Sequence, residues 1–164
     1  MHKPVMLTWA EVCADPSLND LPYKIELNRF NQLVMSPASA RHSRLQGKII
    51  FLLGQLLKSG EAFPELALQT SDNVKAPDVV WAADATLKAH ARESTWSSAP
   101  ELCVEVLSPS NTEEEIDLKR QLYFECGAKE VWVCDWDGAM TFYSPATKLK
   151  RSLLCPKFPT RVKV

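Results

Sequence analysis

The segment Pro100-Glu-Leu-Cys-Val-Glu-Val-Leu-Ser-Pro-Ser110 is typical of a buried β-strand that ends at a proline break. Strand side chains alternate between two faces, so Leu102, Val104 and Val106 share one face and Glu105 lies on the other. An ionised carboxylate among valines and leucines is costly unless it is paired or bound to a cation. Glu105 is therefore the first candidate for chemistry.

The chain that follows this strand predicts one helix and a hairpin. Thr112 begins a capping box, and Gly127 is suited to end the helix that it opens. Expected strands at 130–136 and 139–143 are joined by a tight Asp137-Gly138 turn. The last residues are interrupted by proline and are expected to pack as an extended arm.

The chain that precedes the strand predicts a short helix, a hairpin, a long helix and two further strands. The expected elements are a helix from a Thr8 capping box to a stop before Pro16, strands at 22–27 and 32–35, a Ser39-capped helix to about Lys58, a strand at 62–70, a turn at 71–73, a strand at 77–83, and a polar loop at 84–99 that can hold a short helical turn. This order predicts an α/β sandwich built on a mixed sheet.

The length of 164 residues suits a single domain, with an N-terminal helix and hairpin (7–36), a core (38–144) and a C-terminal arm (145–164). A net charge of −1 gives no support for a large basic nucleic-acid surface. Five widely spaced cysteines without a Cys-x-x-Cys pair argue against structural zinc and favour a reducing cytoplasm. No apolar run approaches the roughly 20 residues that span a membrane, so no membrane partner is expected.

Asp78 stands at the start of the 77–83 strand, and Glu105 lies near the end of the next strand. If the two strands pair antiparallel, the two carboxylates meet at one edge of the sheet. Converging carboxylates form a site for a hard divalent ion, which takes oxygen ligands. The alternative is structural: Asp78 forms the turn before its strand, and Glu105 pairs with a basic side chain.

Lys119 brings a positive charge to the same region. On a helical wheel of residues 112–126 it falls within an apolar stripe that comprises Ile116, Leu118, Leu122, Tyr123 and Cys126. A lysine there must extend to solvent or find an anion, and Asp78 and Glu105 are suited to that role. Such a trio supports phosphodiester hydrolysis, in which one or two Mg²⁺ ions act with a lysine that positions water or stabilises charge on phosphorus. A structural Lys–Glu pair is the alternative interpretation.

Motifs along most of the chain match one known family. They are Tyr23-x-Ile25-Glu26-Leu27, Leu33-Val34-Met35-Ser36-Pro37, His42, Pro77-Asp78, residues 101–110, Asp117-Leu118-Lys119, Tyr123 and Gly127-Ala128-x-Glu130-x-Trp132-x-x-Asp135. Together they resemble the Uma family of putative restriction endonucleases, which has the PD-(D/E)XK nuclease fold. The resemblance covers roughly residues 7–158. It implies a restriction-endonuclease-like α/β fold, with a central mixed β-sheet flanked by helices.

The resemblance implies catalytic roles for the same trio. Asp78 and Glu105 match the two acids that bind the metal ion, Mg²⁺ or Mn²⁺. The standard motif places its lysine two residues after the second acid, where this chain has Leu107. The family lysine lies on the following helix instead and matches Lys119. Glu26 matches a family acid and is an additional metal or active-site candidate.

His42 also matches the family pattern and is a further site candidate, although a lone histidine beside Leu45 and Ile49 is more often structural. The resemblance implies a bacterial, cytoplasmic, Mg²⁺-dependent DNA endonuclease. It also implies a homodimer, because two active sites most simply cut two strands. Two alternatives stay open: an inactive nuclease-fold module for DNA binding or assembly, and a nuclease directed at RNA.

Overall fold

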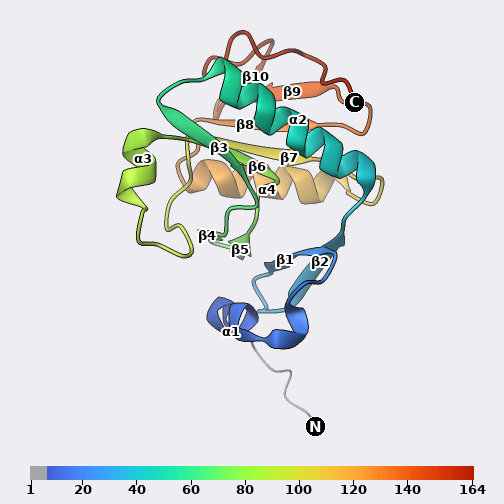
Figure 1. Cartoon of the computed structure of the whole chain (residues 1–164), viewed down its shortest axis with the longest axis vertical. Coiled ribbons are helices and arrows are strands. Elements are labelled where there is room, and N and C mark those ends of the chain that lie inside the picture. The colour runs from blue at the N-terminus through green and yellow to red at the C-terminus, as the bar shows by residue number, and fades with distance from the viewer. Residues whose placement is uncertain (1–6) are drawn as a thin grey trace.

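A computed structural model describes residues 7–164 of the chain (Figure 1). The helices are α1 (Trp9–Ala14), α2 (Ala40–Leu56), α3 (Asp84–Ala89) and α4 (Glu113–Glu125), with a 3₁₀ turn at Pro16–Leu18. The strands are β1 (Tyr23–Leu27), β2 (Leu33–Pro37), β3 (Gly60–Pro64), β4 (Leu68–Thr70), β5 (Asn73–Lys75), β6 (Val79–Ala83), β7 (Leu102–Val106), β8 (Glu130–Cys134), β9 (Met140–Tyr143) and β10 (Lys148–Leu149). Within residues 7–164, no helix is long and apolar enough to cross a membrane.

Six strands form the central sheet, in the order β10–β9–β8–β7–β6–β3. β7 and β8 run parallel, whereas the other neighbouring strands run antiparallel. The sheet is therefore mixed, which confirms the predicted α/β architecture. β6 pairs antiparallel with β7 in the register Val79↔Val104, as the predicted site requires.

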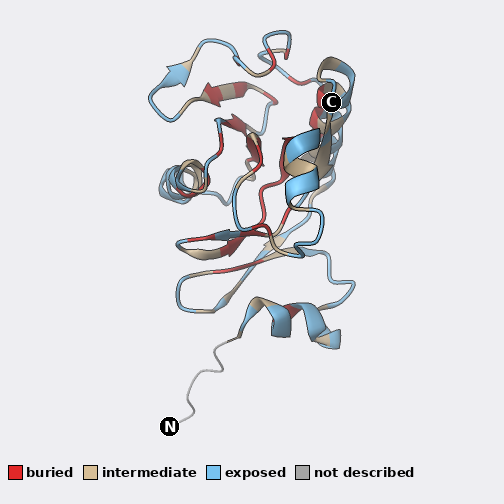
Figure 2. Cartoon of the chain, turned by 90° about the vertical axis from the view of Figure 1, so that its left-hand side faces the viewer, coloured by how far each residue is buried: buried red, intermediate tan, exposed pale blue. Residues whose placement is uncertain are grey.

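β7 separates two halves of the core, because its side chains alternate as predicted. Leu102, Val104 and Val106 pack in one cluster with Leu45, Ile49 and Leu53 of α2. Cys103 packs on the opposite face with Tyr123 of α4. Each fully buried leucine or valine contributes about 1.5–3 kcal/mol. The two helices cover opposite faces of the sheet, and burial is concentrated in the strands between them (Figure 2).

β1 and β2 form a separate antiparallel hairpin, which lies with α1 beyond one end of the central sheet (Figure 1). The β4–β5 hairpin contacts the turn between β1 and β2. The side-chain amide of Asn73 donates to the Asn28 carbonyl at 3.2 Å and to Asn31 Oδ1 at 2.7 Å. Lys75 donates to the Leu27 carbonyl at 3.1 Å. These bonds fix the hairpin beside the start of β6.

The prediction of one continuous strand at 62–70 is wrong, because two separate strands, β3 and β4, occupy this segment. The chain leaves β3 at Pro64, turns at Glu65 with a left-handed φ of 55°, and resumes as β4 in a different sheet. Left-handed backbone is uncommon for glutamate, so the local composition does not reveal the turn. β5 was not predicted as a strand. The short helical turn allowed for in the loop at 84–99 is α3, at the start of that segment.

Candidate active site

Asp78 lies immediately before β6 and is 1% exposed. Its Oδ2 accepts a hydrogen bond from the Val106 amide at 2.8 Å, which ties the carboxylate to the end of β7. Gln46 of α2 donates to the Asp78 carbonyl at 2.8 Å. These contacts hold the carboxylate at the edge where β6 begins and β7 ends.

Glu105 is buried in β7 on the face that α4 covers. The Tyr123 hydroxyl donates to its Oε1. Its Oε2 lies 3.5 Å from Lys119 Nζ and 3.7 Å from Lys24 Nζ. A hydrogen bond and two ammonium groups thus compensate the carboxylate for its loss of water.

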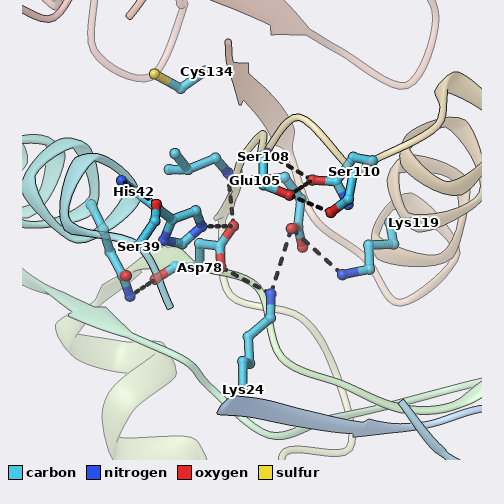
Figure 3. A network of polar contacts seen from close by, with 12 residues as sticks. Lys24, Ser39, His42, Asp78, Glu105, Ser108, Ser110, Lys119 and Cys134 are labelled. Atoms are coloured by element: carbon cyan, nitrogen blue, oxygen red, sulfur yellow. Dashed lines mark hydrogen bonds and ion pairs between the residues drawn. The ribbon is translucent and has the colours of Figure 1, made fainter. Parts of the chain in front are cut away.

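Lys119 of α4 points toward the same carboxylates (Figure 3). Its Nζ donates to Glu26 Oε1 at 2.8 Å. The helical wheel is only partly right, because Tyr123 is fully buried whereas Leu118 is 36% exposed. The apolar stripe of α4 is narrower than predicted, and Lys119 reaches the site from its margin.

Glu26 of β1 joins the cluster as a third buried carboxylate. Its Oε1 lies 2.8 Å from Lys119 Nζ and 3.5 Å from Lys24 Nζ. Its Oε2 is buried without a hydrogen-bond partner among residues 7–164. Buried carboxylate oxygens rarely lack a partner, so this atom marks a position that a cation or a water molecule can complete.

Lys24 of β1 is the site residue that the sequence interpretation missed. Its ammonium reaches between the acids (Figure 3), 2.9 Å from Asp78 Oδ1 and within 4 Å of both glutamates. Lys24 and Glu26 are two residues apart on a strand and therefore share a face. That spacing was the available signal, but it does not reveal which acids elsewhere in the chain the lysine meets.

His42, in the first turn of α2, also reaches the site. Its Nε2 lies 3.4 Å from Asp78 Oδ2. The hydrogen bond to Asp78 outweighs burial and raises the pKa of His42. The structure therefore brings Asp78, Glu105, Lys119, Glu26 and His42 together in one place.

Burial and charge act in opposite directions on the three acids. Burial raises the pKa of Glu105 to about 7, against the attraction of Lys119 and Lys24. Burial also acts to raise the pKa of Asp78, but Lys24 and His42 outweigh it and hold that pKa well below its usual range. Glu26 shows the same balance, with Lys119 and Lys24 lowering its pKa.

A small cleft of about 80 Å³ is lined by Lys24, His42, Asp78, Glu105 and Lys119, with Ser36, Ser108 and Asn111. Glu26 lines a neighbouring pocket, which Lys119 also lines. A water molecule needs roughly 10–15 Å³ of such space, so the cleft has room for an ion with a few waters. A nucleotide does not fit inside it.

The chemistry of the cleft fits a divalent cation. The acids offer the carboxylate oxygens that Mg²⁺ and Mn²⁺ prefer, and Glu26 Oε2 is free to accept. The three carboxylates form ion pairs with two lysines, Lys24 and Lys119. As the side chains stand in residues 7–164, no three His, Cys, Asp or Glu groups are close enough to hold a metal ion. Lys24 stands between Asp78 and Glu105 (Figure 3).

Comparison with known proteins identifies the fold and the family of the chain. A solved structure with the same fold is that of a putative nuclease belonging to DUF820 from Anabaena variabilis, at a TM-score of 0.67 and 19% identity, covering 86% of this chain and 81% of the other. The chain therefore has the predicted restriction-endonuclease-like fold. No curated protein matches the sequence significantly. The model of the Uma2 family, described as putative restriction endonuclease, matches residues 15–146, so the chain belongs to the Uma2 family.

Proposed function

We propose that this protein is a metal-dependent DNA endonuclease, with Asp78 and Glu105 as ligands of Mg²⁺ or Mn²⁺ and Lys119 as the catalytic lysine. The observation that carries the proposal is the meeting of these three side chains in one cleft. Membership of a family of putative restriction endonucleases favours the same function. Glu26, whose second oxygen has no partner among the described residues, is proposed as a third ligand.

Some residues of the site orient the two acids, and others are proposed to take part in the reaction. Tyr123 and the Val106 amide orient Glu105 and Asp78, so that one oxygen of each acid is fixed by a donor. A divalent ion, when bound, would polarise the phosphoryl oxygen and acidify a water molecule. Lys119 keeps its positive charge, because its acidic neighbours outweigh burial and raise its pKa. It therefore acts by orienting water or by stabilising negative charge on phosphorus.

Plasmid cleavage with Mg²⁺ and then Mn²⁺ tests the proposal. Wild type is expected to nick or linearise the plasmid, and Asp78→Asn and Lys119→Met are each expected to lose at least 100-fold in rate, the scale on which such charged groups contribute. Glu114→Gln, on the exposed side of α4, is the matched control and should cleave like wild type. Equal cleavage by all four proteins would contradict the proposed site.

RNA of the same sequence should be tested in parallel. Cleavage of RNA but not of DNA would transfer the same chemistry to an RNA-directed nuclease. Binding of DNA without cleavage of either polymer, under all metal conditions, would identify a non-catalytic nuclease-fold module instead. The three outcomes separate the proposed function from the two alternatives that the sequence leaves open.

A further inference from the structure

Lys24 places its ammonium among the three carboxylates that we propose as metal ligands. Its Nζ lies 2.9 Å from Asp78 Oδ1, 3.5 Å from Glu26 Oε1 and 3.7 Å from Glu105 Oε2. Its side chain is 11% exposed, so the ammonium has exchanged most of its water for these three carboxylates. An ammonium in this place is a cation supplied by the chain itself.

Two other lysines nearby are held differently. Among residues 7–164, Lys119 pairs with Glu26 and Glu105 but not with Asp78. Lys75 pairs with Asp72 at 3.1 Å and donates to a backbone carbonyl, outside the three-acid cluster. Lys24 is thus the lysine that contacts all three acids, and the described residues give it no other polar partner.

Charge and space prevent Lys24 and a divalent ion from sharing these oxygens. Like charges a few ångströms apart repel strongly in a poorly solvated site. The lysine side chain is a flexible four-carbon chain. Its ammonium can therefore move to the cleft mouth while the backbone pairing of β1 with β2 stays intact. When the ammonium leaves, its ion pairs with the acids are lost. The free energy of those ion pairs reduces the net binding free energy of the metal.

We propose that Lys24 competes with the metal ion: its ammonium pairs with the three carboxylates in the metal-free protein and leaves them when the ion binds. Lys24 therefore lowers the metal affinity of the site and compensates part of the acids' charge without metal. This inference rests on the proposed function only in assuming that the carboxylates take a divalent ion.

Titration calorimetry with Mn²⁺ on the full chain tests the competition. Lys24→Met is expected to bind Mn²⁺ at least tenfold more tightly than wild type, and to unfold at a lower temperature in the absence of metal. Lys48→Met removes an exposed lysine of α2 that lies against Phe51 and pairs with none of the three acids, and should bind Mn²⁺ within twofold of wild type. Unchanged or weaker binding by Lys24→Met, or no binding by either protein, overturns the inference.

Amine labelling of the wild type answers the same question without a variant, should Lys24→Met fail to fold. Limited acetylation followed by mass spectrometry should show Lys24 labelled at least threefold faster in saturating Mg²⁺ than in chelator, with Lys75 unchanged. Equal or slower labelling of Lys24 with Mg²⁺ overturns the inference.

The two proposals fail separately. Plasmid cleavage by wild type with no change in Lys24 labelling retains the nuclease and rejects the competition. Tighter Mn²⁺ binding by Lys24→Met, with no cleavage of DNA or RNA by wild type, rejects the nuclease and retains the competition.

Discussion

Glu105 shows most directly how a single residue of this site is tuned. The face of β7 that carries it is closed by α4, so burial raises its pKa to about 7. Asp78, one strand away, is equally buried, but Lys24 and His42 outweigh burial and lower its pKa. Two neighbouring carboxylates thus differ in proton affinity because of their surroundings, a pattern common at functional sites.

The raised pKa of Glu105 predicts a pH dependence of stability. The folded protein binds this proton more tightly than the unfolded chain, so the contribution of Glu105 to stability decreases as the pH rises from 4.5 to about 7. Asp78 acts oppositely and in another window, because its contribution is lost only as the pH falls below 3.8. Urea unfolding in chelator, compared between wild type and Glu105→Gln across pH 4.5–7, measures the difference. Parallel curves for the two proteins would contradict the prediction.

The hydroxyl of Tyr123 predicts a second effect at this scale. Tyr123→Phe leaves Glu105 without its donor while the aromatic ring still fills the core. At a pH above 7, where Glu105 is ionised, losing this buried hydrogen bond is expected to lower the free energy of unfolding by about 1.5–3 kcal/mol. Tyr143→Phe, on a half-buried ring beside Arg120, is the control and should change it by less than about 0.5 kcal/mol. Urea denaturation of both variants measures the change.

At the scale of elements, the sequence predicted strands and helices best where one regular pattern continued. The alternation in β7 and its antiparallel pairing with β6 placed Asp78 beside Glu105, and the wheel of α4 placed Lys119 nearby. The same reasoning failed at Glu65, whose left-handed backbone has no local signal. It also missed Lys24, because β1 belongs to a separate hairpin and only tertiary docking brings it to the acids.

Glu130, at the start of β8, holds the C-terminal arm in place. Its carboxylate accepts at 2.7–2.9 Å from Trp132 Nε1, Ser152 Oγ and the amides of Leu153 and Leu154. Glu130→Gln replaces one acceptor oxygen by a donor, which is expected to lower the free energy of unfolding by about 2–3 kcal/mol and to release the arm. Limited trypsin digestion should then cut faster at Lys150 and Arg151 than in wild type. An unchanged cleavage rate there would show that the arm is held by other contacts.

Two glycines predict opposite responses to the same substitution. Gly138, in the β8–β9 turn, has φ 87°, and an added Cβ would collide with the Val162 carbonyl. Gly138→Ala is therefore expected to destabilise the protein by about 1–3 kcal/mol. Gly47 lies on the exposed side of α2 with open space around it, so Gly47→Ala should stabilise by about 0.5–1 kcal/mol. Thermal unfolding of both variants tests the pair, and a shift in the same direction would contradict it.

At the scale of the whole molecule, the described residues bring the proposed catalytic groups together in one small cleft. Cutting both strands of a duplex is simplest with two such clefts. We therefore predict a homodimer, with a mass in analytical ultracentrifugation of about twice the 18.4 kDa of one chain. A single species at the monomer mass, under conditions that support plasmid linearisation, would instead require two successive nicking events.

The ion pair between Lys119 and Glu26 joins residues 93 positions apart in the chain. Contacts of such sequence separation form late, since a long loop must close before they add stability. A ribosome that has made the hairpin, β6 and β7 has not yet delivered the lysine on which the proposed hydrolysis depends. Incomplete products of synthesis would therefore carry the acids without the lysine that we propose to be catalytic, and we expect them to be inactive.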